Sequence, residues 1–138
     1  GDYIDVPDGD DVPDTAEAEQ GPTHTWGTDT LVPVFEYWNF NVRKYTVHAD
    51  PPEGDEAKRR FLFYAFAYHA PGSEAVGSFL RNYKGYVRMD IHMGEARPYE
   101  WQQGVACYAY PRNVAGSSPV FQFWNTKLLE HCTTWARR

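Results

Sequence analysis

The sequence has few of the residues that mark several common classes of protein. Its two cysteines, Cys107 and Cys132, form no CxxC pair and lie beside no spaced pair of histidines. They predict neither a disulfide-rich scaffold nor a zinc framework, and they fit a reduced, intracellular site of assembly. No apolar run of about 18 residues is present, and the first residues are acidic where a secretion signal needs basic ones. We therefore expect no membrane span and no secretion signal.

Catalytic motifs are also scarce. The chain contains no GxSxG, GxxxxGK[ST] or GxGxxG sequence, which mark common hydrolases, nucleotide hydrolases and dinucleotide-binding enzymes. Its histidines form no HxH or HExxH pattern, and they are His24, His48, His69, His92 and His131. We expect a protein that is not an enzyme and that binds no cofactor or metal.

Aromatic residues, by contrast, are abundant. They make up 17% of the 138 residues, with 10 Tyr, 8 Phe and 5 Trp. Aromatic side chains suit the half-buried, pleated surface of a sheet, and this length fits one domain with a single core. The composition predicts a mainly β protein.

Acidic residues are concentrated at one end of the chain. Residues 1–20 contain Asp and Glu but no Lys or Arg, so the rest of the chain is mildly basic. We expect residues 1–29 to form an acidic extended arm and residues 30–138 to form a β-sandwich domain. The arm is either disordered, as its composition suggests, or ordered by contact with neighbouring subunits.

Several segments predict strands from their apolar and aromatic pattern, and residues 74–82 and 126–136 predict short helices. Residues 49–60, which end in the basic run Lys58-Arg59-Arg60, predict a surface loop that could contact phosphate. No internal repeat is evident at a spacing of 20 to 50 residues. The expected strands are residues 31–37, 41–48, 61–68, 84–93, 104–110 and 120–124. The first two of these could also form one long bulged strand.

The clearest alternation lies in residues 84–93, where Val87, Met89, Ile91 and Met93 predict a buried face. Asp90 and His92 would then lie on the solvent side as a polar surface, or less readily as an acid–base or metal site. In the strand at residues 104–110, Cys107 predicts a small core residue and not a nucleophile.

Two segments resemble the middle of the capsid proteins of picornavirus-like RNA viruses, which adopt the jelly-roll fold. The matching residues are Tyr83-Lys84-Gly85 and the stretch from Gln103-Gly104 to Pro111, and Gln20-Gly21 resembles a processing junction of such viruses. In that family, Gly85 would permit close approach where a helix becomes a strand, and Pro111 would end a strand at the rim.

The resemblance implies an antiparallel β-sandwich of jelly-roll type, or part of one, with one or two short helices. It implies a structural capsid protein of the virion, assembled in the host cytoplasm with other capsid subunits and in weak contact with viral RNA. The alternative is a β-sandwich module that binds sugar or peptide through exposed aromatics. Clustering of Trp26, Trp38, Trp101 and Trp124 on one open face would favour that alternative.

Overall fold

A computed structural model describes residues 3–7, 24–49, 52, 54–125 and 132–137 of the chain, and every regular element in them is a β-strand. None of these residues forms a helix long and apolar enough to cross a membrane. The strands are β1 (Tyr3–Pro7), β2 (His24–Trp26), β3 (Asp29–Asn39), β4 (Lys44–Ala49), β5 (Glu56–Phe66), β6 (Glu74–Tyr83), β7 (Tyr86–Met93), β8 (Glu100–Ala109), β9 (Ser117–Asn125) and β10 (Cys132–Arg137).

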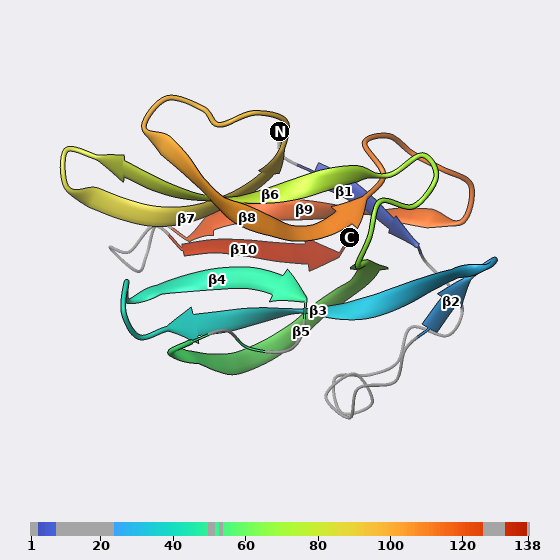
Figure 1. The fold of residues 1–138 in the computed structure, drawn as a ribbon, viewed down its shortest axis with the longest axis horizontal. Coiled ribbons are helices and arrows are strands. Elements are labelled where there is room, and N and C mark those ends of the chain that lie inside the picture. Colours follow the sequence, from blue (N-terminus) through green and yellow to red (C-terminus); the bar gives the residue numbers. More distant parts are fainter. Residues whose placement is uncertain (1–2, 8–23, 50–51, 53, 126–131, 138) are drawn as a thin grey trace.

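The strands form two antiparallel sheets (Figure 1). The smaller sheet has the order β1-β9-β10, and the larger has the order β2-β3-β5-β8-β6-β7, with β4 also paired to β3. A single pair, Phe66 with Tyr108, joins β5 to β8. The larger sheet therefore consists of two halves that meet at one point.

The main core lies between the two sheets. Val6 of β1 and Val120 of β9 are fully buried, and they pack with Val34, Phe63 and Val76 of the larger sheet in one apolar cluster. Burial of such side chains is the principal favourable term in folding. The expectation of a mainly antiparallel β protein is confirmed.

The two expected helices are wrong. Residues 74–82 lie in β6, because β7 and β8 pair with it on both sides and Gly77, a poor helix former, is buried near its centre. Cys132–Arg137 is the strand β10, whereas residues 126–131 lie outside the described part of the chain. The predicted loop at residues 49–60 is shorter than expected, since β5 begins at Glu56 and includes the basic run.

The larger sheet contains an internal repeat that the sequence pattern did not reveal. In residues 29–66, the first repeat, β3 is central and pairs with β4 and β5. In residues 74–109, the second repeat, β6 is central and pairs in the same way with β7 and β8. The expectation of no repeat is therefore wrong.

The register confirms that the two repeats correspond residue by residue. Val34 pairs with Ala49 and Phe63, and its equivalent, Val76, pairs with Met93 and Cys107. The third strand also changes register at the same places in both repeats. These shifts fall at Val34/Phe35 and Glu36/Tyr37 in the first repeat, and at Val76/Gly77 and Ser78/Phe79 in the second.

One difference between the repeats is the length of the hairpin. Asn39 and Lys44 form the last pair of β3 and β4, whereas β6 and β7 continue beyond the equivalent pair to join Asn82 with Val87 and Tyr83 with Tyr86. The extended β6–β7 hairpin therefore has no counterpart in the first repeat.

Candidate functional site

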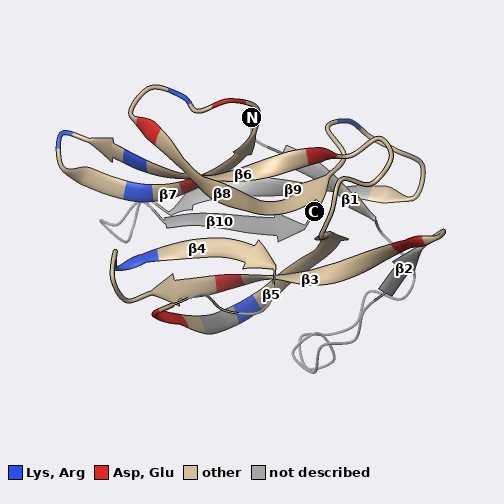
Figure 2. Ribbon diagram, viewed as in Figure 1, with Lys and Arg blue, Asp and Glu red and all other residues tan. Residues whose placement is uncertain are grey.

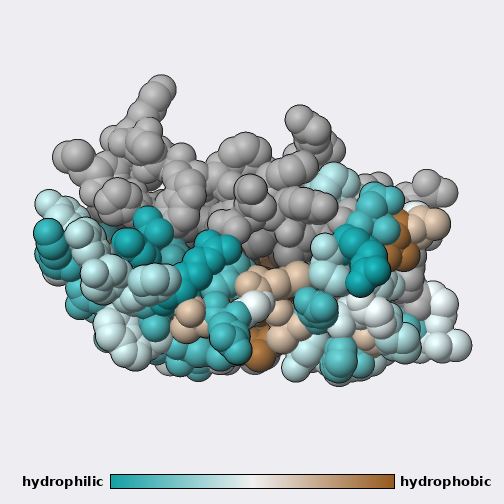
Figure 3. All heavy atoms as spheres, turned by 90° about the horizontal axis from the view of Figure 1, so that it is seen from above, coloured by the Kyte–Doolittle hydropathy of each residue, from teal (hydrophilic) through white to brown (hydrophobic). Residues whose placement is uncertain are grey.

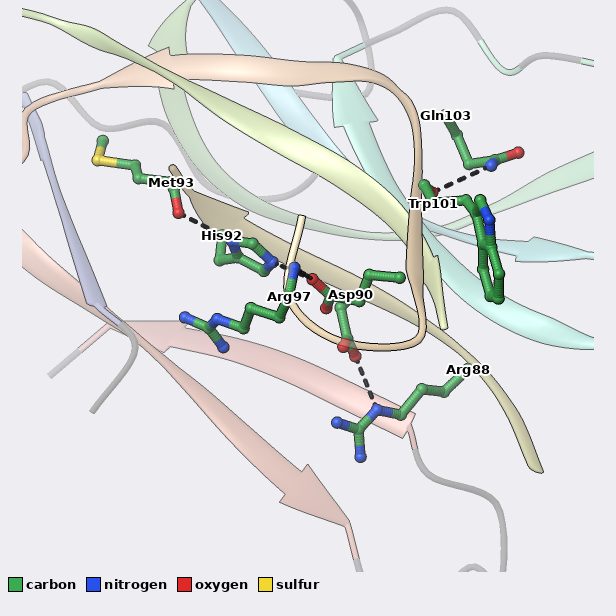
Figure 4. A network of polar contacts seen from close by, with 8 residues as sticks. Arg88, Asp90, His92, Met93, Arg97, Trp101 and Gln103 are labelled. Carbon is green, nitrogen blue, oxygen red and sulfur yellow. Dashed lines mark hydrogen bonds and ion pairs between the residues drawn. The ribbon is translucent and has the colours of Figure 1, made fainter. Parts of the chain in front are cut away.

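A buried histidine–glutamate pair joins β7 to β8 in the second repeat (Figure 4). His92 Nε2 lies 2.7 Å from Glu100 Oε1, and His92 Nδ1 lies 2.8 Å from the carbonyl oxygen of Met93. The side chains of His92 and Glu100 are 3% and 1% exposed. Both ring nitrogens of His92 therefore face oxygen atoms of the chain. We call this pair the second clamp, because it lies in the second repeat.

An aromatic ring covers the second clamp. Phe79 stacks on His92 with ring centroids 4.1 Å apart and planes inclined by 4°. This position of Phe79 requires the glycine at position 77, because a Cβ atom there would lie 2.7 Å from the Phe79 ring. Gly77 therefore leaves room for the Phe79 ring, and the Phe79 ring stacks on the imidazole of His92.

Asp90 completes the second clamp. Burial raises its pKa to about 7, the neighbouring Glu100 carboxyl adds to the rise, and the Arg88 guanidinium, whose Nε lies 2.9 Å from Asp90 Oδ1, opposes it. Glu100 Oε2 has no other hydrogen-bond partner in the described part of the chain. Asp90 and Glu100 share a side-chain hydrogen bond, and a carboxyl can donate in such a bond only when it carries a proton.

Glu100 is held in its charged form. Burial by itself would raise its pKa, but hydrogen bonds from Asp90, from the Arg97 N–H and from His92 lower it. The Arg97 nitrogen lies 2.7 Å from Glu100 Oε1, so the same carboxylate also fixes the loop that precedes β8.

The first repeat contains an equivalent cluster, the first clamp. His48 Nε2 lies 2.6 Å from Glu56 Oε1, and His48 Nδ1 lies 2.7 Å from the carbonyl oxygen of Ala49. The Thr46 hydroxyl donates to Glu56 Oε2, in the place that Asp90 occupies in the second clamp. Tyr37 stacks on His48 with centroids 4.3 Å apart, as Phe79 does on His92.

The geometry of both clamps suits a structural role. Each ties the end of one strand to the start of the next through a carboxylate eight residues further along the chain. All the ring nitrogens are engaged with atoms of the chain itself. Among the described residues, no group of three or more His, Cys, Asp or Glu could hold a metal ion.

The expectation that Asp90 and His92 lie on a solvent-facing surface is wrong, since they are 5% and 4% exposed. Alternation correctly separates them from Met89 and Ile91, which are buried on the other face. Phe79 and the loop held through Arg97 enclose the polar face as well. The repeated spacing of His and Glu was the sequence signal for this site.

The residues that resemble a capsid motif fall in two places. Tyr83, Lys84 and Gly85 lie at the tip of the β6–β7 hairpin, where Lys84 and Gly85 have φ angles of 50° and 85°. The positive φ angle of Gly85 therefore suits a tight turn. Gly85 does not permit a close approach between a helix and a strand, because no atom lies within 4 Å of where its Cβ would be.

Gln103 and Gly104 lie within β8, and Pro111 follows its end. A small hollow with a volume of ≈170 Å³ lies where β4 meets β8, and Gln103 and Gly104 border it. Its lining residues are His48, Ser78, Gln103, Gly104, Val105 and Ala106. Gln20 and Gly21, the candidate processing junction, lie outside the described residues.

Cys107 is a core residue, as expected. Its side chain is buried in the main cluster, and burial raises the pKa of its thiol to about 12. A thiol in this environment stays protonated and unreactive near neutral pH.

Two of the four tryptophans expected to cluster, Trp38 and Trp101, have described side chains. Trp38 is half-buried and packs against Tyr45, with ring centroids 5.0 Å apart, whereas Trp101 on β8 is 56% exposed. The side chains of Trp26 and Trp124 lie outside the described part of the structure.

Together, the sheets and the two clamps define an antiparallel β protein whose larger sheet contains two related three-stranded units. No protein-family model, curated protein sequence or solved structure matches the chain.

Proposed function

We propose that the chain is a structural subunit of a protein shell, of the kind built by capsid proteins of small non-enveloped RNA viruses. Its partners would be other capsid subunits, and it would be found in the virion after assembly in the host cytoplasm. In this proposal, the two packed sheets form an antiparallel sandwich of jelly-roll type, or part of one.

The observation that carries the proposal is the number of open sheet edges. Within the described residues, β1 and β10 each pair with β9 alone, β2 and β4 each pair with β3 alone, and β7 pairs with β6 alone. An edge strand presents backbone N–H and C=O groups that readily pair with another chain. In a shell, neighbouring subunits would cover such edges.

The two clamps support the same proposal. A shell subunit needs rigid strands more than an exposed reactive group, and each clamp uses its polar atoms to connect strands inside the chain. The class of shell rests on the sequence resemblance of Tyr83-Lys84-Gly85 and Gln103-Gly104 to capsid proteins alone, since the residues before Tyr83 form a strand and Gln103 lies within β8.

The assembly state tests this proposal directly. The chain would be expressed alone and together with the other proteins of its genome, then studied by native mass spectrometry and electron microscopy. We expect closed, symmetric particles that contain the chain. A stable monomer that joins no particle in either preparation would contradict the proposal.

Exposed aromatics favour a second candidate, a module that binds sugar or peptide. Trp101 and Val105 are 56% and 45% exposed on β8, and the Gln103 amide lies beside Trp101, donating to its carbonyl oxygen. Aromatic faces with neighbouring amides suit such ligands. Titration of oligosaccharides and peptides against tryptophan fluorescence, with Trp101→Ala as the control, would detect this function.

A further inference from the structure

The extended β6–β7 hairpin presents aromatic rings at one end of the molecule. Tyr86 and Tyr99 are 66% and 53% exposed. Tyr83 contacts Tyr99 edge to face, with centroids 4.7 Å apart, so the hairpin and the loop before β8 form one surface. We call this surface, made of Arg81, Tyr83, Lys84, Tyr86, Arg97 and Tyr99, the hairpin surface.

Cations accompany these rings. Arg81 Cζ lies 5.4 Å and Lys84 Nζ lies 5.3 Å from the centre of the Tyr83 ring, and Arg97 is exposed on the adjacent loop. Lys and Arg gather at this end of the molecule in Figure 2.

Among the described residues, few acidic groups offset this positive charge. Asp90 and Glu100 are buried within the second clamp, and Glu95 is the exposed acid of the loop that carries Arg97. In the view of Figure 3, this end of the molecule is teal to white, whereas tan and brown gather near the middle of the visible face. The hairpin surface is therefore polar and basic, unlike a purely apolar docking patch.

The backbone holds these side chains in position. Lys84 and Tyr99 have φ angles of 50° and 66°, a left-handed conformation that is uncommon outside glycine and that often occurs at functional sites. The Asn82 N–H donates to the Tyr99 carbonyl oxygen at 3.0 Å. The second clamp holds the same loop through Arg97, so the surface is formed before any ligand arrives.

Comparison of the repeats shows that the tip of this surface has no counterpart in the first repeat. The pairs Asn82–Val87 and Tyr83–Tyr86, which lengthen the β6–β7 hairpin, have no equivalents in β3 and β4. Packing of the shared three-stranded unit therefore does not account for the aromatic and basic residues at the tip.

We propose that the hairpin surface binds single-stranded nucleic acid. Exposed rings stack on unpaired bases, and interleaved cations contact the phosphates, a combination that binds single strands with little sequence preference. RNA binding at this surface does not require shell assembly, because all the residues that form the hairpin surface belong to one chain. It differs from the expected phosphate contact at Lys58-Arg59-Arg60, which lies on β5.

Fluorescence anisotropy of the monomeric fraction tests the proposal, with a labelled single-stranded RNA of about 12 nucleotides. Tyr86→Ser should weaken binding about fivefold or more, because a stacking contact is lost. Lys84→Glu should weaken binding and flatten its salt dependence. Arg112→Glu, an equal change of charge in the loop after β8, is the control and should stay within about twofold of the parent chain.

Two further measurements separate base stacking from general attraction to anions. A duplex of the same sequence and heparin should both compete poorly, since neither offers unpaired bases. Equal competition by either, together with full binding by Tyr86→Ser, would overturn the proposal. NMR shift perturbation of the unmodified chain by the same RNA should be centred on Tyr83, Tyr86 and Tyr99, and perturbations elsewhere alone would also contradict it.

Discussion

The two repeats contain the same histidine–glutamate pair but complete it with different donors. In the first clamp, the Thr46 hydroxyl donates to Glu56, and this donor is present at any ordinary pH. In the second clamp, Asp90 occupies the equivalent position and donates only when protonated, and burial raises its pKa to about 7. The comparison indicates that the unit needs a donor at this position, whereas the chemical nature of the donor decides whether stability depends on pH.

The largest expected effect comes from removing the shared carboxylate. Glu100→Ala leaves His92 buried beside no carboxylate partner, which should lower the free energy of unfolding by about 3–5 kcal/mol. Glu56→Ala should cost less, because the His48 side chain is 14% exposed and can gain some hydration. Urea denaturation of both variants gives the comparison, and an equal or larger loss from Glu56→Ala would contradict it.

The next largest effect is expected at Gly77, which lies beside the stacked ring of Phe79. Gly77→Ala would place a Cβ atom 2.7 Å from Phe79, so we expect a loss of about 1–3 kcal/mol from overpacking. Gly104→Ala is the matched control, because no atom lies within 4 Å of its Cβ position and its φ angle is not positive. Similar denaturation midpoints for the two variants would show that Phe79 moves freely.

The donors themselves can be exchanged. The pKa of Asp90 rises from 3.8 to about 7 on folding, so its contribution to stability is complete below about pH 4 and is lost as pH rises through 7. Asp90→Asn supplies a permanent donor to Glu100, so its melting temperature should exceed that of the parent chain at pH 8 and approach it at pH 5.

The reciprocal change, Thr46→Asp, should give the first clamp the pH dependence that the second clamp now has. Thermal melts between pH 4 and pH 9 would show this as a steeper loss of stability near neutral pH. A parallel pair of curves for Thr46→Asp and the parent chain would contradict the equivalence of the two clamps.

The smallest expected effect lies at the tip of the longer hairpin. Lys84→Gly relieves a positive φ angle and should raise stability by up to about 1 kcal/mol. If the hairpin surface binds single-stranded RNA, the same change should also weaken that binding. A variant that gains stability and keeps full affinity would show that Lys84 does not contact the ligand.

Much of the strand pattern could be predicted from local sequence. The strands expected at residues 61–68 and 84–93 correspond to β5, which ends at Phe66, and to β7, which begins at Tyr86. Cys107 lies in the core, as its alternation suggested. Residues 74–82 could not be assigned in this way. Val76, Phe79 and Leu80 fit helical spacing, and only pairing with β7 and β8 decides the strand.

The repeat escaped prediction for a physical reason. Equivalent residues are 42 apart from Val34 to Val76 but 44 apart from His48 to His92, because the longer hairpin intervenes. A search for a repeat of one fixed length therefore does not align all the equivalent residues. Within the equivalent strands, the core positions also differ in size, as with Phe63 and Cys107, since each repeat packs against different neighbours.

By itself, the sequence determined the β character of the chain, the alternation of faces in its clearest strand and the core position of Cys107, because these depend on residues close together in the chain. Only the tertiary structure decided that Asp90 and His92 are buried, that Glu56 and Glu100 meet their histidines, and that the two halves of the sheet repeat one another. Alternation separates the two faces of a strand, but what covers each face depends on segments brought together by folding.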